Sequence, residues 1–233
     1  MTTIAGSVAL VTGGRRGLGK AFVDELLVRG AKKVYATARK PAPSDDERVE
    51  ALALDVTDDA SVAALAERVR DVDVIFNNAG VLYPAPLLTG DLQQVKDMFD
   101  TNVYGPLRIA KAFAPILADN GGGALVDIHS LLSWGAGGGA YGATKAALWS
   151  LTNSLRIELA GQNTQVVGVH LGFADTDMVA ALPVEKISAA DAARIVLDGV
   201  ERGDSEVLVD DVTREIKAAL AGPVEGLTVP INR

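Results

Sequence analysis

The stretch "VTGGRRGLG" occupies residues 11–19 and continues a short apolar run. Its glycines are Gly13, Gly14, Gly17 and Gly19. Glycine loops expose backbone N–H groups without steric cover, and the two arginines in this loop, Arg15 and Arg16, favour an anionic ligand. The apolar spacing within residues 18–26 predicts a helix whose N-terminus faces that ligand. We therefore expect a phosphate-binding turn from strand to helix; the alternative is a tight turn that needs glycine only for its geometry.

Apolar runs of strand length recur along the chain and alternate with stretches of helical spacing. The runs cover 8–12, 34–38, 73–77, 124–130, 165–171 and 206–210. Between two of them, Val62, Leu65 and Val69 repeat at helical spacing after a start rich in Ser and Asp. This alternation predicts an α/β fold with a parallel sheet covered by helices on both faces. Ligands of such sheets bind at the carboxyl ends of the strands.

The composition restricts the class of protein. A chain of 233 residues without a linker-like stretch suits a single domain over 1–233. The net charge of −8 argues against nucleic acid or an anionic membrane surface as a partner. The absence of cysteine excludes disulfides, and no apolar run reaches the roughly 18 residues of a membrane span, so we expect a cytoplasmic protein. His129 and His170 lack metal-ligand spacing; we expect structural strand residues and no metal site.

Candidate catalytic residues occur in the second half of the chain. Tyr141 and Lys145, in "YGATK", are four residues apart in a helix-permissive run and would project from one helix face. A neighbouring ammonium lowers the pKa of a phenol from about 10 and makes it a usable general acid/base. Ser130 ends a predicted strand, where its hydroxyl can donate to a carbonyl oxygen or cap the next turn. A surface Tyr and Lys on an amphipathic helix would be the alternative for the first pair.

Five separated motifs occur together in a fixed order. They are the glycine loop, "NNAG" (77–80), Asn102, Ser130 and "YGATK" (141–145). In this combination the chain resembles the short-chain dehydrogenase/reductase family over nearly its whole length. The resemblance implies a single doubly wound parallel sheet of Rossmann type, in three α/β/α layers, a nicotinamide cofactor and interconversion of a carbonyl and an alcohol.

The resemblance also implies roles for individual residues. Tyr141 would be the general acid/base, Lys145 would bind the nicotinamide ribose and tune Tyr141, and Ser130 would orient the carbonyl. Asn102 would hold a water of the proton relay, or alternatively cap a helix. Ser133 is a second-choice donor. The cofactor-binding residues would be Gly13, Arg15, Arg16, Gly17, Leu18, Gly19, Arg39, Asp55, Val56, Asn78, Ala79, Gly80, Tyr141, Lys145, Gly172 and Thr176.

The end of the second predicted strand indicates NADP(H). An NAD enzyme carries an acidic residue there for the ribose hydroxyls. This chain has Ala38 at that place and Arg39 next to it. Arg16 can reach the same 2′-phosphate from the other side, whereas Arg15 is expected to face solvent or a neighbouring helix. Asp55 resembles the residue that binds the adenine amino group, and Thr176 the residue that meets the nicotinamide carboxamide; each could instead be a helix cap.

The chain departs from the family pattern around the substrate. The stretch from Ser130 to Tyr141 is short and rich in glycine, and Leu171 stands where the family commonly has proline. We expect residues 174–188 to fold over the site as a lid. The candidate apolar lining consists of Trp134, Phe173, Met178, Val179 and Leu182.

The favoured function is therefore an NADPH-dependent carbonyl reductase or alcohol dehydrogenase acting on a small, apolar carbonyl or alcohol. The alternative is a regulatory protein that senses NADP without turnover. The helix carrying Tyr141 also holds more apolar residues than one face needs, among them Leu151 and Leu155. By resemblance, this surface predicts a homodimer or homotetramer.

Overall fold

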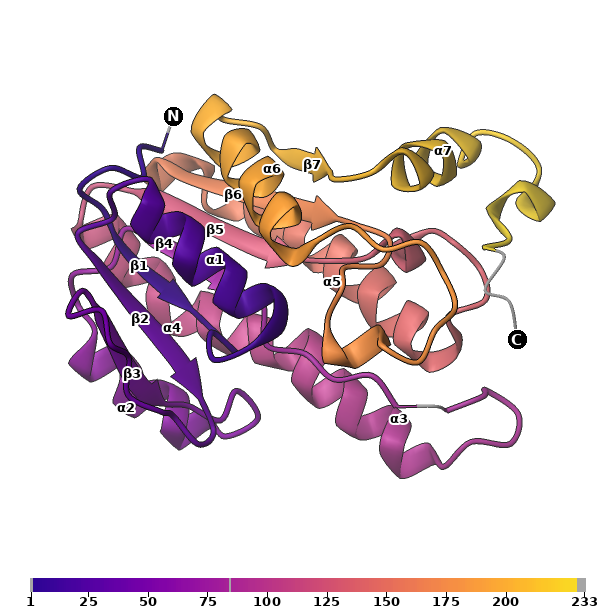
Figure 1. Cartoon of the computed structure of the whole chain (residues 1–233), viewed down its shortest axis with the longest axis horizontal. Coiled ribbons are helices and arrows are strands. Elements are labelled where there is room, and N and C mark those ends of the chain that lie inside the picture. The colour runs from indigo at the N-terminus through magenta and orange to yellow at the C-terminus, as the bar shows by residue number, and fades with distance from the viewer. Residues whose placement is uncertain (1, 84, 230–233) are drawn as a thin grey trace.

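The structure is a computed structural model that describes residues 2–83 and 85–229. Its centre is one sheet of parallel strands in the order β3-β2-β1-β4-β5-β6-β7 (Figure 1). The strands are β1 (Val8–Val11), β2 (Lys33–Ala38), β3 (Val49–Ala53), β4 (Val74–Asn77), β5 (Gly123–Ile128), β6 (Thr164–His170) and β7 (Glu206–Leu208). The doubly wound Rossmann-type fold is thereby confirmed.

Helices cover both faces of the sheet. They are α1 (Gly17–Val28), α2 (Asp59–Arg68), α3 (Leu92–Phe99), α4 (Gly105–Asp119), α5 (Gly139–Glu158), α6 (Ala189–Arg202) and α7 (Asp211–Ala219). A π-helical turn at Asp100–Tyr104 joins α3 to α4 without a break. Helices α1 and α6 pack together on one face, while α2 and α4 lie on the other.

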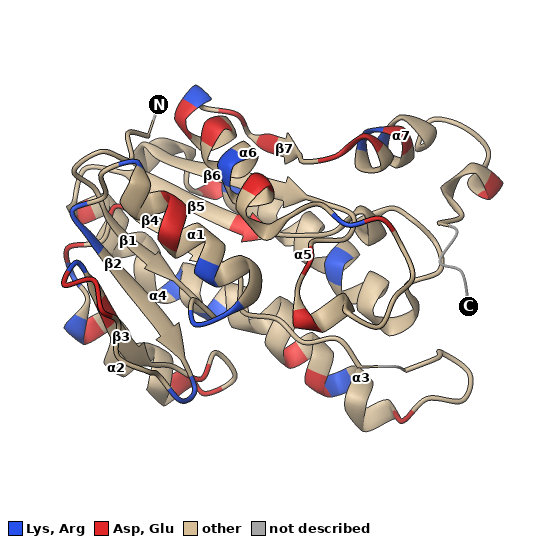
Figure 2. Cartoon of the chain, viewed as in Figure 1, with Lys and Arg blue, Asp and Glu red and all other residues tan. Residues whose placement is uncertain are grey.

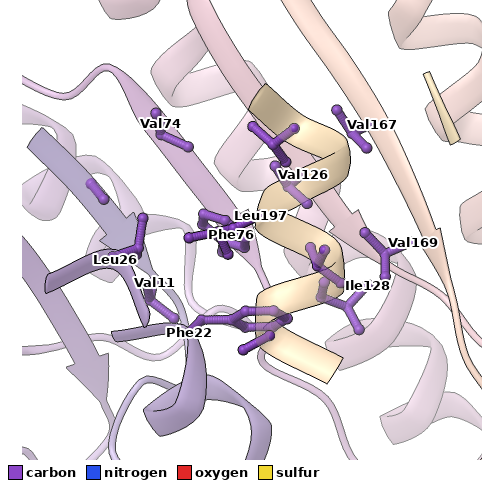
Figure 3. Packing of buried hydrophobic residues seen from close by; sticks show 14 of the residues in the cluster. Val11, Phe22, Leu26, Val74, Phe76, Val126, Ile128, Val167, Val169 and Leu197 are labelled. Atoms are coloured by element: carbon purple, nitrogen blue, oxygen red, sulfur yellow. The ribbon is translucent and has the colours of Figure 1, made fainter. Parts of the chain in front are cut away.

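The alternation of buried side chains along each strand explains why both faces are apolar. In β4, Val74 and Phe76 belong to the core under α1 and α6, whereas Ile75 belongs to the core under α2 and α4. Figure 3 shows Phe76 against Phe22 of α1, with ring centroids 4.9 Å apart. Strands buried on both sides need apolar residues at every position, which is the pattern of continuous Val-rich runs.

The strand order places the site. From β1 the chain adds β2 and β3 toward one edge, and from β4 onward it adds strands toward the other. The order therefore reverses between β1 and β4, where the loops after the two strands diverge and leave a crevice. Among the described residues, no helix combines the length and apolar character needed to cross a bilayer.

Candidate active site

The glycine loop is held against the segment after β4 by side-chain and backbone bonds. The Thr12 hydroxyl accepts from the backbone N–H groups of Asn78 and Ala79, both at 3.0 Å. The Asn78 amide donates to the Thr12 carbonyl at 2.9 Å. A Cβ on Gly19 would lie 2.2 Å from the Gly13 carbonyl oxygen, so this contact requires glycine. These bonds define one end of the crevice at the N-terminus of α1, where N–H groups favour an anion.

A single cleft of about 2450 Å³ runs along the carboxyl ends of the strands. Its lining includes every candidate catalytic, cofactor-binding and apolar residue named from the sequence except Asn102, Ser133 and Trp134. The cleft thus brings together residues from the ends of β2 and β5, from the segments after β1, β4 and β6, and from α5, which lie up to 163 positions apart between Gly13 and Thr176. Gly13 and Gly17 have positive φ, 67° and 55°, which only glycine adopts readily.

The arginines of the glycine loop point in two directions. Arg15 Nη1 donates to the Lys40 carbonyl at 3.0 Å, which places Arg15 beside Arg39 at the end of β2. Arg16 Nη1 instead lies 3.7 Å from an oxygen of Asp177 in the 174–188 loop. Figure 2 shows the basic residues of the glycine loop and of the end of β2 at the same edge of the sheet. Arg15, expected to face solvent or a helix, is therefore the loop arginine that lies with Arg39.

Asp55 follows β3 and lines the same end of the cleft. Its Oδ1 accepts from the backbone N–H of Thr57 at 3.0 Å and from the Thr57 hydroxyl at 2.7 Å. These bonds, together with the charges of Arg39 and Arg108, hold the pKa of Asp55 below its usual value. Asp55 therefore shapes a local turn, and Asp58 is the residue that caps α2.

Ser130 follows β5 and is buried at the floor of the cleft. Its Oγ accepts from Leu132 N–H at 3.1 Å and caps the short 3₁₀ turn Leu131–Ser133. Ser133 Oγ accepts from the Ser130 backbone N–H at 3.4 Å, so Ser133 supports Ser130. Because the Ser130 oxygen is used as an acceptor, its proton remains available to a group in the cleft. Capping and donation are thus compatible in one residue.

Tyr141 and Lys145 lie on the same face of α5 and both line the cleft. The Lys145 ammonium is 5.6 Å from the centroid of the Tyr141 ring, and it donates to the Ile128 carbonyl at 2.7 Å. Burial lowers the pKa of Lys145 to about 8, while the charge of Asp127 raises it. Burial raises the pKa of Tyr141 above its usual value. The spacing on the helix is as expected, but the lowered pKa expected for the phenol is absent from this state of the protein.

Asn102 lies beside the cleft in the π-helical turn, one residue after the cleft-lining Thr101. Its amide donates to the Val81 carbonyl at 2.9 Å and to Thr144 Oγ1 at 3.1 Å, and its Oδ1 accepts from Val81 N–H at 2.9 Å. The side chain is therefore engaged in fixing the segment after β4 against α5. It sits inside a helical turn, so it does not cap a helix, and its part in a proton relay stays a prediction.

Residues 174–188 reach from the end of β6 toward the glycine loop. Hydrogen bonds between the backbones of Phe173, Asp175 and Ile187 close the base of this loop. Thr176 lies over the glycine loop: a Cβ on Gly17 would be 3.3 Å from Thr176 Cγ2. The Thr176 hydroxyl donates to the Ala174 carbonyl at 3.3 Å.

The apolar wall differs in part from the expected one. Phe173, Met178, Val179 and Leu182 line the cleft, but Trp134 does not. Trp134 is buried and stacks on His170 with centroids 3.9 Å apart, because the turn after Ser130 directs it under α7. Sequence reasoning missed the opposite wall, residues 82–83 and 85–89. The sequence feature that could have indicated this wall is the cluster of apolar residues directly after "NNAG", in a segment without strand or helix periodicity.

The end of the described chain also reaches the site. The Ala136 N–H donates to the Leu227 carbonyl at 2.7 Å, and the Val229 N–H donates to the Ala136 carbonyl at 3.0 Å. Val229 is buried near Gly135, where an added Cβ would meet it at 2.4 Å. The glycine-rich stretch before α5 is therefore braced by the C-terminal segment, a contact that no local pattern indicated.

Comparisons with known proteins agree with this arrangement. The family model for short chain dehydrogenases matches residues 7–186. The 3-oxoacyl-(acyl-carrier-protein) reductase FabG of Escherichia coli K12 is 35% identical over 188 residues, covering 76% of this chain and 77% of that protein. A 1-deoxy-11-beta-hydroxypentalenate dehydrogenase of Streptomyces avermitilis is 34% identical over 214 residues, covering 82% and 79%.

Solved structures give the same result for the whole fold. A short chain dehydrogenase from Burkholderia cenocepacia J2315 in complex with NADP has a TM-score of 0.92 and 36% identity, covering 97% of both chains. One from Sphingobium yanoikuyae in complex with NADPH has a TM-score of 0.82 and 27% identity, covering 95% of this chain and 94% of that one. The resemblance seen in the sequence is confirmed: this chain belongs to the short-chain dehydrogenase family of oxidoreductases.

Proposed function

We propose that this chain is a single-domain NADPH-dependent oxidoreductase that interconverts a carbonyl and an alcohol. The observation that carries the proposal is that Ser130, Tyr141 and Lys145 line the same cleft as the glycine loop and Arg39. The candidate proton donors and the candidate site for a dinucleotide phosphate therefore lie in one cleft, at the point where the strand order reverses.

The pKa shift of Tyr141 favours reduction of a carbonyl over oxidation of an alcohol. Burial raises the pKa of Tyr141, so at neutral pH its phenol holds the proton that a carbonyl oxygen must receive. Lys145 spends one N–H on Ile128 and keeps the others for ribose hydroxyls, and its charge stabilises the phenolate left after proton transfer. Ser130 donates to the carbonyl oxygen as charge develops on it. A reduced nicotinamide, when bound, supplies the hydride.

The adenosine end of the cleft favours the phosphorylated cofactor. Ala38 leaves no carboxylate where a 2′-phosphate would lie, and Arg15 and Arg39 lie together there. A guanidinium binds phosphate oxygens through two parallel N–H groups, which suits this role. Relatives solved with NADP and NADPH support the same choice.

The substrate end of the cleft favours an apolar carbonyl compound. Leu82 and Leu87 lie in one wall, and Met178 and Leu182 in the other. Residues 174–188 would act as a lid over this end, since the base of the loop is closed by hydrogen bonds while its apolar side chains line the cleft. Trp149 and Leu155 of α5 pack within the chain, and assembly into a homodimer or homotetramer rests on the family resemblance.

Tyr141→Phe tests the function directly. With NADPH and a panel of apolar aldehydes and ketones, the natural protein should oxidise NADPH, and the variant should lose turnover by about 1,000-fold while keeping its affinity for NADPH. Tyr104→Phe is the matched control, because Tyr104 is 51% exposed in the π-helical turn outside the cleft lining. Binding of NADPH without turnover of any carbonyl by the natural protein would favour the regulatory NADP sensor instead.

A further inference from the structure

Behind the site, a buried chain of hydrogen bonds links β5, β6 and α5. Asp127 Oδ2 is 2.7 Å from Thr152 Oγ1, which is 2.9 Å from His129 Nε2. His129 Nδ1 is 2.9 Å from His170 Nε2, and His170 Nδ1 is 3.2 Å from the Ser130 carbonyl oxygen. All five residues are buried. The chain ends on the residue that would orient the substrate carbonyl.

The number of protons that this hydrogen-bond chain requires follows from whether the groups at its two ends can donate or only accept. The Ser130 carbonyl and an ionised Asp127 can only accept, so the four contacts need four protons. The Thr152 hydroxyl and two neutral imidazoles supply three. Two further acceptors lie close by, the Leu148 carbonyl at 2.9 Å from Thr152 and Glu206 at 3.4 Å from His170. Both are acceptors, so neither supplies a proton to the four contacts.

We propose that this hydrogen-bond chain holds one proton more than Thr152 and two neutral imidazoles supply, and that this proton lies on the carboxyl group of Asp127. His170 then donates from Nδ1 to the Ser130 carbonyl and positions Ser130. Every bond then runs in one direction. Asp127 donates to Thr152, Thr152 to His129 Nε2, and His129 Nδ1–H to His170 Nε2. Without the additional proton the direction of donation reverses along the hydrogen-bond chain. His170 Nδ1 then carries no hydrogen and faces the Ser130 carbonyl oxygen, which is also an acceptor.

Complete burial is the influence that favours a proton on the carboxyl group of Asp127. Burial raises the pKa of Asp127, lowers that of His129 and lowers that of His170 to about 3, so the imidazoles stay neutral. Among the described residues, the charges of Lys145 and Arg156 of α5 act in the opposite direction and lower the pKa of Asp127. Glu206 and Lys217, which pair with each other, lie at the His170 end of the hydrogen-bond chain. The Asn77 amide donates to the second Asp127 oxygen at 2.8 Å; this contact lowers the pKa of Asp127, but a protonated carboxyl group can also accept it through its carbonyl oxygen.

The backbone leaves room for the two rings. A Cβ on Gly168 would lie 2.9 Å from His129 Cε1, so glycine at this position of β6 allows the ring to occupy its place. Trp134 covers the outer face of His170. With its carbonyl bound by His170 and its Oγ bound by Leu132 N–H, Ser130 is held from two sides. His170 acts through Ser130, so it is a positioning residue, and this effect on catalysis rests on the proposed function.

Nitrogen-15 NMR of the histidine rings tests the proton directly, because the chain has only these two histidines. We expect both rings to carry hydrogen on Nδ1 at pH 7. In Asp127→Asn the amide supplies a permanent donor to Thr152, so the same state should persist as the pH rises, whereas the natural protein switches to Nε2–H once Asp127 ionises. Hydrogen on either Nε2, or a cationic ring, in the natural protein at pH 7 would overturn the proposal.

Turnover tests the positioning of Ser130 separately. His170→Phe keeps a ring against Trp134 but removes the donor, so kcat should fall by about tenfold with KM for NADPH unchanged. His170→Asn should recover part of the loss, since its amide can donate from the place of Nδ1. Thr213→Val is the control, a buried threonine with no partner for its hydroxyl among the described residues. Equal losses in His170→Phe and His170→Asn would contradict the positioning role, and absence of turnover in all of them would concern only the proposed function.

Discussion

The two ends of the cleft are built in different ways. At the cofactor end, backbone groups after β1 and β4 bond to each other through Thr12 and Asn78, and Gly19 permits the contact. At the substrate end, the walls are loops with exposed apolar side chains, such as Leu88 at 98% and Met178 at 48%. The first end is specified by residue spacing along a few elements, and the second by loops that meet only in the folded chain.

The largest loss of stability and cofactor affinity is expected at the cofactor end of the cleft, where the contact at Gly19 leaves no room for a side chain. Gly19→Ala would place a Cβ 2.2 Å from the Gly13 oxygen and 2.5 Å from Asn78 Nδ2, two atoms held by the bonds between the glycine loop and the segment after β4. The loop must shift, so we expect a loss of about 2–3 kcal/mol in the free energy of unfolding and a rise on the order of 100-fold in Kd for NADPH. Thermal or urea unfolding and fluorescence titration measure the two quantities.

Gly161→Ala is the matched control for this change. A Cβ on Gly161 meets nothing within 4 Å, and the residue lies away from the cleft. Its stability and its affinity for NADPH should stay close to those of the natural protein. If Gly19→Ala behaves like this control, the glycine loop is more adaptable than its contacts indicate, and the contrast between the two ends weakens.

A smaller effect is expected from the charge at the adenosine end. Arg39→Asp replaces a guanidinium by the carboxylate that favours ribose hydroxyls and repels a 2′-phosphate. Kd for NADPH should rise by roughly 30- to 100-fold, while Kd for NADH should change by less than about threefold. Titration of each variant with both cofactors measures the difference. Equal weakening of both would show that Arg39 does not lie at the 2′-phosphate.

The contrast between the ends also explains what sequence could predict. The Val-rich runs predicted every strand except β3, because strands buried on both faces must be apolar throughout, whereas β3 lies at the edge of the sheet and contains Glu50. The loop after β1 follows from glycine spacing. The directions of Arg15 and Arg16 could not be predicted, because they depend on Lys40 and Asp177 across the cleft. Trp134 was misplaced for the same reason: an apolar side chain after Ser130 can face the cleft or the core, and packing against His170 decided it.

The smallest effect is expected at the substrate end, where single side chains are half-exposed and the loops can adapt. Met178→Ala should raise KM for a bulky apolar ketone by about fivefold, equivalent to roughly 1 kcal/mol of lost contact, and leave Kd for NADPH unchanged. Val28→Ala, an exposed apolar residue at the end of α1 that does not line the cleft, should change neither quantity. A rise in Kd for NADPH instead would assign this loop to the cofactor. The 174–188 loop would then belong to the cofactor end of the cleft as well as to the substrate end. This is structurally reasonable because Asp177 of this loop contacts Arg16 of the glycine loop.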